Sequence, residues 1–200
     1  MQNSRVVILD NGSGYMKAGF STDEIPSCTI PALVGRPMLR YSEHIESYQI
    51  NPIMIGDEVI PVRSMLELKH PMKEGIIQDK EDIELLWRYT INKKLNVPES
   101  DFSNLKVMVT EAPMNPNKNK EIMAQILFEN IGVGYFNVEP QAKLSLLCEG
   151  LSSGVVLDSG DGVTHCIPIF SNSIMHHQIK RLNVAGRHIT DYLIRLLQLK

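Results

Sequence analysis

The alternation of apolar and polar residues predicts short buried strands separated by amphipathic helices. Near the start, four apolar residues at 6–9 precede Asp10, and a turn with Gly12 and Gly14 leads to a second apolar run that ends at Phe20. A run, a tight turn and a returning run predict a β-hairpin. The tip of such a hairpin exposes backbone N–H groups, which can bind anionic oxygens. Taken alone, a turn of this kind commonly does no more than close a hairpin.

The rest of the chain continues to alternate between strand-like and helix-like segments. Asp79 is a candidate N-cap for a helix over 80–94, with Leu86 and Trp87 on its apolar face. Residues 38–52 follow no firm period, which predicts a mobile loop. Further strands are expected at 30–37, 53–55, 106–110, 135–138, 154–158, 164–170 and near 174, and further helices from 117 or 119, at 141–149 and at 186–200.

The first hairpin is repeated late in the chain. The pattern Asp-x-Gly-x-Gly at 10–14 recurs at 158–162 with the same internal spacing, and each copy follows an apolar run. A repeated supersecondary unit indicates a repeated architecture. Two facing hairpins, each with an Asp at the end of a strand and a Gly-rich tip, can hold a polyphosphate and its cation from both sides. The repeat therefore predicts a phosphate-binding protein.

Composition narrows the class of protein. Hydrophobic residues make up 43% and charged residues 22% of 200 residues, and the net charge is −3. These values are ordinary for a globular protein and argue against a nucleic-acid surface or a polybasic membrane patch, so neither partner is expected. No apolar stretch approaches the roughly 20 residues of a membrane span, and Asp10 interrupts the early apolar run of a would-be signal peptide. The chain is expected in the cytoplasm.

The cysteines and the two adjacent histidines of the chain do not predict a metal-binding site. Cys28, Cys148 and Cys166 lack metal-ligand spacing and are expected to be reduced, mostly buried thiols. His176 and His177 are adjacent, and neighbours on an expected strand point to opposite faces. One metal ion is therefore not expected to bind both imidazoles.

The paired turns at 10–14 and 158–165 resemble the two phosphate loops of the actin family. The similarity also runs through 34–37, 110–116 and 185–187. Some stretches resemble the type-two actin-related branch of the family more than they resemble conventional actin, namely 63–67, 94–97 and 113–119. Proteins of this branch belong to the branch-nucleating complex. The implied fold is α/β: the actin-like, RNase H-like ATPase fold, in truncated form, with a mixed sheet and flanking helices.

The resemblance also implies a domain organisation. Residues 1–150 would form the first actin-like domain, with a small lid subdomain at about 36–72, and residues 151–200 would begin the second. The last expected helix has no terminating residue, and the second copy has barely begun its own strands and helices. The chain is therefore interpreted as the N-terminal half of a longer protein.

The resemblance implies ATP or ADP with Mg²⁺ or Ca²⁺ as cofactor. Asp10 and Asp158 would hold the cation through its water shell. The remaining nucleotide-binding candidates are Asn11, Gly12, Ser13, Gly14, Tyr15 and Lys17 from the first hairpin, and Ser159, Gly160, Asp161, Gly162 and Val163 from the second. Because the family keeps its adenosine-contacting segment in the other half, the affinity of this chain for ATP is expected to be poor.

Three residues are implied to orient the attacking water: Gln141, Asp158 and His165. Glu139, followed by Pro140, departs from the actin pattern. It is a candidate to approach the metal or to replace Gln141 in part, and the alternative is a solvated carboxylate. At reference pKa values only the imidazole is a fair base, so slow hydrolysis is expected at most.

The implied function is that of an ATP-binding, actin-related cytoskeletal subunit. Its nucleotide state would switch its conformation in the nucleation of branched actin filaments, and this part alone would be inactive as an ATPase. Expected partners are actin, the other subunits of the branch-nucleating complex and nucleation-promoting factors. The alternatives are a sugar-kinase-type phosphotransferase of the same fold, a divergent conventional actin, and a member that has lost nucleotide binding.

Overall fold

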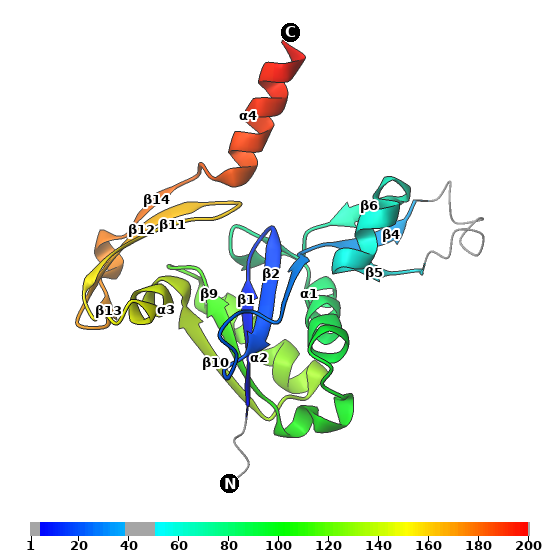
Figure 1. The fold of residues 1–200 in the computed structure, drawn as a ribbon, viewed down its shortest axis with the longest axis horizontal. Helices are drawn as coiled ribbons and strands as arrows, with labels where there is room; N and C mark the ends of the chain where they lie inside the picture. Colours follow the sequence, from blue (N-terminus) through cyan, green and yellow to red (C-terminus); the bar gives the residue numbers. More distant parts are fainter. Residues whose placement is uncertain (1–4, 39–50, 200) are drawn as a thin grey trace.

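The computed structural model describes residues 5–38 and 51–199. Its largest sheet has the order β10-β9-β1-β2-β3 (Figure 1). The three strands β1, β9 and β10 run parallel, whereas β1, β2 and β3 are joined antiparallel. The carboxyl ends of the parallel strands therefore meet at one edge of the sheet. The bounds are β1 Val6–Asn11, β2 Tyr15–Phe20, β3 Cys28–Pro31, β9 Lys106–Glu111 and β10 Tyr135–Pro140.

Two helices cover one face of this sheet. α1 (Lys80–Arg88) continues into a π-helical segment (Tyr89–Lys94), and α2 (Asn117–Gln125) does the same (Ile126–Ile131). The predicted N-cap is confirmed, because the carboxylate of Asp79 accepts hydrogen bonds from the backbone N–H groups of residues 81 and 82. The helices and the sheet share one core, to which Val7, Leu9, Ile83, Leu86, Trp87, Val107, Val109, Met123, Ile126 and Leu127 contribute.

A small three-stranded sheet of order β5-β4-β6 stands beside α1, with its own core of Met54, Val59 and Leu66. It contains β4 (Val34–Pro37), β5 (Met54–Ile55), a 3₁₀ segment (Gly56–Met65) and β6 (Leu66–Lys69). Arg36 of β4 pairs with the fully buried carboxylate of Asp82 on α1 at 2.5 Å, which joins the two parts.

The single strand predicted at 30–37 is wrong. The chain forms β3 and β4 there, which belong to different sheets, because it turns at Ala32 and Leu33. Residue 38 and residues 51–52 of the predicted mobile loop are described, and residues 39–50 lie outside the described residues.

The repeated hairpin forms a second sheet, whose path β11-β12-β13 is extended by β14 pairing with β12. The strands are β11 (Gly154–Ser159), β12 (Thr164–Phe170), β13 (Ser173–Ile174) and β14 (Lys180–Leu182), of which β14 was not predicted. Residues His176–Gln178 form a 3₁₀ turn rather than a strand, so the opposite-face argument for the two histidines was wrong. Within the described ranges no group of three or more His, Cys, Asp or Glu side chains could hold a metal ion.

α3 (Gln141–Cys148) joins the two sheets, and Gly150 after it adopts positive φ, a conformation that commonly follows the end of a helix. Ala142 and Leu146 on this helix pack with Ile167 and Ile169 of β12. The helix therefore lies before the predicted domain boundary at residue 150 but packs on the sheet that follows it. The division itself stays a prediction.

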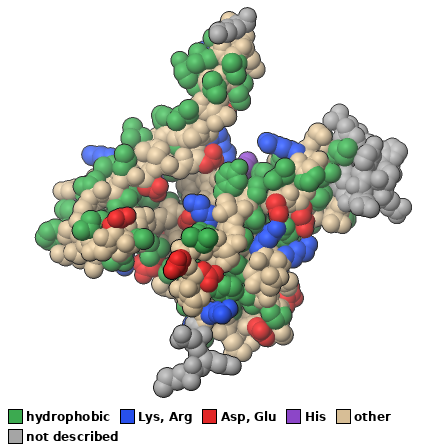
Figure 2. Space-filling model, in the orientation of Figure 1, with side chains coloured by type: hydrophobic (Ala, Val, Ile, Leu, Met, Phe, Trp, Pro, Cys, Tyr) green, Lys and Arg blue, Asp and Glu red, His purple; other side chains and the backbone are tan. Residues whose placement is uncertain are grey.

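α4 (Gly186–Gln198) extends away from both sheets (Figure 1). None of its residues is buried, and hydrophobic side chains line it on the face shown in Figure 2. A two-stranded sheet of β7 (Met72–Lys73) and β8 (Ile76–Ile77) and a 3₁₀ segment (Glu99–Asn104) complete the described elements. In the part of the chain that the structure describes, no helix is long and apolar enough to cross a bilayer.

Candidate functional site

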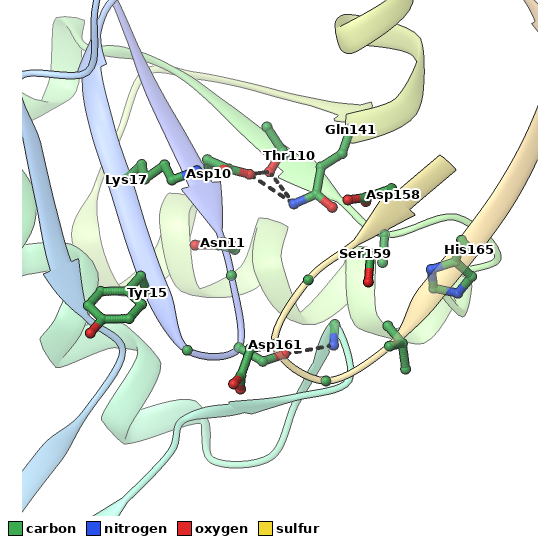
Figure 3. Close-up of a pocket in the computed structure, with 18 of the residues that line it drawn as sticks. Asp10, Asn11, Tyr15, Lys17, Thr110, Gln141, Asp158, Ser159, Asp161 and His165 are labelled. Carbon is green, nitrogen blue, oxygen red and sulfur yellow. Dashed lines mark hydrogen bonds between the residues drawn. The ribbon is translucent and has the colours of Figure 1, made fainter. Parts of the chain in front are cut away.

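A cleft of about 540 Å³ lies between the tips of the two repeated hairpins. Figure 3 shows the turn after β1 and the turn after β11 facing each other across it. Every nucleotide-binding and cation-binding candidate lines the cleft, as do Gln141 and His165. Of the predicted site residues, only Glu139 is absent from the lining. The further lining residues, which sequence reasoning did not predict, are Gly75, Thr110, Ala112, Leu144 and Ser145.

The glycines of the first turn permit close approach of chain segments. A Cβ on Gly12 would lie 2.3 Å from the carbonyl oxygen of Tyr15, and a Cβ on Gly14 would lie 3.1 Å from the Cβ of Asp161. Neither glycine has positive φ. Their role is therefore steric rather than conformational, and Gly14 in particular lets the two turns meet.

The two turns present backbone donors that the protein does not use. Within residues 5–38 and 51–199, the N–H groups of Ser13, Gly14, Asp161, Gly162 and Val163 donate to no protein acceptor. Backbone N–H groups are strong donors that are normally paired when they are removed from water. Successive unpaired N–H groups in a turn form a concavity suited to anionic oxygens.

Asp10, Thr110 and Gln141 form a hydrogen-bonded group at one side of the cleft (Figure 3). The Thr110 hydroxyl donates to Asp10 Oδ1 at 2.5 Å, and Gln141 Nε2 donates to the same oxygen at 2.8 Å. Gln141 Nε2 also lies 3.2 Å from Thr110 Oγ1. The three residues follow or end three adjacent parallel strands, which is where open α/β sheets commonly bind ligands.

Asp158 and His165 lie on the opposite side of the cleft, paired across β11 and β12. The His165 side chain is only 3% exposed, and its Nε2 has no hydrogen-bond partner among the described residues. Burial lowers the pKa of His165 below its usual 6.5, and the positive charge of Arg181 adds to this effect, while Asp158 opposes it. His165 is therefore neutral at pH 7 and forms part of the wall of the cleft.

Among the described residues that line the cleft, Lys17 is the one lysine or arginine. It faces Asp10 across the first hairpin, as the register of β1 and β2 dictates. Within the described ranges it forms no ion pair with a carboxylate. Asp161, by contrast, is paired with Arg187 at 2.6 Å, which ties the second turn to the start of α4. The unpaired charges at the cleft are thus those of Asp10, Asp158 and Lys17.

Two predicted site residues have side chains engaged elsewhere. Glu139 forms an ion pair with Lys143, four residues further along, at 3.0 Å. Asn11 is buried, and its side-chain oxygen accepts a hydrogen bond from the indole N–H of Trp87 at 2.9 Å. The Asn11 side chain therefore anchors the first turn to the core below it.

A third turn approaches the two hairpin tips. Gly75 N–H donates to Ser13 Oγ at 3.4 Å, and Glu74 forms an ion pair with Arg181 of β14. A Cβ on Gly162 would lie 3.6 Å from the Cα of Glu74. The turn between β7 and β8 thus bridges both halves of the site.

The expectation of mostly buried thiols is wrong, because none of the three cysteines is fully buried. Cys28 and Cys166 are half-buried, whereas Cys148 is exposed at the end of α3. All three are free. Burial raises the pKa of the Cys28 thiol, which disfavours the reactive thiolate.

The chain belongs to the actin family, whose profile, described as Actin, matches residues 1–200. This match confirms the predicted α/β fold with a mixed sheet and flanking helices, in a 200-residue form. Its similarity to curated relatives shows that the chain is an actin-related protein. It is 47% identical over 97% of its length to Actin-related protein 2 of Schizosaccharomyces pombe, and 44% identical over 99% to Actin-related protein 2 of Acanthamoeba castellanii.

A third relative, Actin-related protein 2 of Saccharomyces cerevisiae, is 45% identical over 96% of the chain. The predicted similarity to the type-two actin-related branch is therefore confirmed. The chain covers 49%, 50% and 49% of these three relatives, which is about half of their length.

Proposed function

We propose that this chain supplies the phosphate- and cation-binding part of an ATP-dependent, actin-related cytoskeletal protein. The observation that carries the proposal is the pair of Asp-x-Gly-x-Gly turns that face each other across one cleft. In this account ATP or ADP binds with Mg²⁺ or Ca²⁺ between the two turns. Whether ATP or ADP is bound sets how closely the two halves approach, which makes the protein a conformational switch.

The backbone supports binding of the phosphates. Unpaired N–H groups come from both turns, at 13–14 and 161–163, so oxygens in the cleft can be bound from two sides. Lys17 adds a positive charge that no carboxylate of the described residues neutralises. Its place beside Asp10 puts that charge at the end of the cleft where the parallel strands finish.

The charges of the cleft favour a cation together with the polyphosphate. Asp10 and Asp158 each carry a negative charge that Lys17 alone does not balance, so a free triphosphate would be repelled. A divalent cation neutralises phosphate charge and can be held through its waters by the two carboxylates.

The same geometry supports slow hydrolysis at most. The Gln141 amide oxygen can accept a hydrogen bond from a water in the cleft, and the His165 imidazole lines the same cleft. Neutral His165 is a weak base because its pKa is lowered, and Gln141 is no base at all. Hydrolysis is therefore proposed to act as a timer for the switch rather than as a metabolic reaction.

The proposed cellular role follows from the relatives. Their printed name, Actin-related protein 2, favours a role in the cytoplasm and the cytoskeleton, in nucleation of branched actin filaments. The proposed partners are actin, the other subunits of the branch-nucleating complex and nucleation-promoting factors. Membership of the actin family disfavours the sugar-kinase alternative.

The proposal is tested by binding of Mg–ATP and of Mg–tripolyphosphate to the 200-residue chain. Asp10→Ala and Asp158→Ala are each expected to weaken binding of both probes by about ten- to a hundredfold, the equivalent of one charge-assisted contact. Asp101→Ala is the matched control, because Asp101 is an exposed carboxylate outside the cleft. Calorimetric titration supplies the affinities.

Two outcomes would overturn the proposal. One is equal affinity of the wild type and both cleft variants for the two probes. The other is the same loss in Asp101→Ala as in the cleft variants, which would show a general charge effect. Tripolyphosphate is included because it lacks adenosine, so weak binding of the base does not obscure the phosphate site.

A further inference from the structure

We propose that Thr110 is a positioning residue of the cleft, which fixes the direction of the Gln141 amide through Asp10. This inference deepens the function proposed above and rests on it for its biological meaning. Its physical content, the orientation of one side chain, does not depend on nucleotide binding.

The strand order explains why Thr110 occupies this position. β9 lies between β1 and β10, and all three run parallel. Thr110 near the end of β9 is thus flanked by Asp10 near the end of β1 and by Gln141, which follows β10 directly. Its side chain is 5% exposed, so its hydroxyl depends on protein partners rather than on bulk water.

Donor and acceptor chemistry fixes the direction of every bond in the group. An ionised carboxylate only accepts hydrogen bonds, so Asp10 Oδ1 requires a donor from each neighbour. The Thr110 hydroxyl uses its proton for Asp10 and can accept from Gln141 Nε2 with a lone pair. Gln141 Nε2 then points toward both residues, at 2.8 Å from Asp10 and 3.2 Å from Thr110.

These hydrogen bonds also determine which group the Gln141 amide presents to the cleft. Because Nε2 faces Asp10 and Thr110, the Gln141 carbonyl oxygen is directed toward Asp158, as Figure 3 shows. The cleft side of Gln141 therefore presents an acceptor, which is the group needed to orient a water. A flipped amide would place its oxygen against the carboxylate and would present donors to the cleft.

The same hydrogen bonds give the two oxygens of the Asp10 carboxylate different surroundings. Oδ1 receives two protein donors, from Thr110 and Gln141. Oδ2 receives none among the described residues. One oxygen is thus held in place by the protein, while the other is left for water or a hydrated cation.

The test uses the side-chain amide signals of Gln141 in ¹⁵N-labelled chain, identified by their loss in Gln141→Ala. In the wild type these protons are expected to exchange slowly with solvent. Thr110→Val keeps the size of the side chain but removes the hydroxyl, and exchange is expected to become about tenfold faster, as for the loss of the one hydrogen bond that Gln141 Nε2 donates to Thr110. Thr110→Ser retains the hydroxyl and is expected to restore slow exchange.

Thr90→Val is the matched control. Thr90 is a second buried threonine, and its hydroxyl donates to the carbonyl oxygen of Leu86 outside the cleft. This variant should lose stability in the same way as Thr110→Val without changing the Gln141 signals. A change of the Gln141 signals in Thr90→Val would show that the effect is general loosening, which would contradict the proposal.

The proposal is overturned if Thr110→Val leaves the exchange of the Gln141 amide unchanged, or if Thr110→Ser behaves like Thr110→Val. The measurement needs no nucleotide, so it can succeed while the binding test of the proposed function fails, and the reverse also holds. With Mg–ATP added, Thr110→Val is expected to lower affinity by less than Asp10→Ala, because the Asp10 carboxylate itself remains.

Discussion

Among single residues, His165 has the environment with the clearest consequence for stability. Its pKa is lowered in the folded chain by burial and by Arg181, whereas the unfolded chain has the ordinary value of about 6.5. Between the lowered pKa and 6.5 the unfolded state binds a proton that the folded state does not. The free energy of unfolding is therefore expected to decrease as pH falls below about 6.5.

Urea unfolding between pH 7.5 and 5.5 measures this dependence. His165→Gln cannot titrate and should show a shallower loss of stability toward low pH than the wild type. His177→Gln, at an exposed position, is the control and should follow the wild type. A wild-type profile that stays flat, or that rises as pH falls, would contradict the assigned environment. His70 has a pKa lowered by burial and by Arg187, so part of the slope should persist in His165→Gln.

Most of the candidate site could be predicted from residue types and spacing. The repeated Asp-x-Gly-x-Gly pattern marked both turns because the chemistry of phosphate binding is local there. Thr110 was missed because its role depends on the order of three strands, which spacing along the chain does not reveal. Glu139 was a candidate to approach the metal or to replace Gln141 in part, with a solvated carboxylate as the alternative; its side chain pairs with Lys143, four residues further on.

Secondary-structure elements were predicted well where the period was regular. The helix over 80–94 and the strands β1, β2, β9, β10, β11 and β12 were found because buried faces impose a regular pattern. The break between β3 and β4 was missed because apolar residues continue through the turn at 32–33. β14 was missed because its three residues are all exposed and carry no alternation.

α4 is expected to be the least protected helix of the chain. Its residues 186–198 include no buried side chain, in contrast to α1, where Ile83, Leu86 and Trp87 are buried. Helices of this length depend on packing for most of their stability. Amide hydrogen exchange, measured at low protein concentration, should therefore be fast in α4 and slow in α1 and β12. Protection of α4 equal to that of α1 would contradict the exposed position of this helix.

The described residues form three hydrophobic cores, and the elements of the first two meet at the cleft. The main sheet with α1 and α2 forms the first, α3 with the second sheet forms the next, and the small sheet at β4–β6 forms the last. Contacts between the first two include the approach of Gly14 to Asp161 and the ion pair of Glu74 with Arg181. Ion pairs that are this exposed contribute only up to about 1 kcal/mol, so the relative position of the two halves is open to control by a ligand.

The central claim is that both hairpins hold one cation–triphosphate group. The most direct measurement follows the backbone amide signals of Gly14 and of Gly160 and Gly162 while Mg–ATP is added. The account predicts that signals from both turns shift along one common saturation curve, and that ATP without a divalent cation produces little shift. Shifts confined to one turn, or equal shifts with and without the cation, would contradict it.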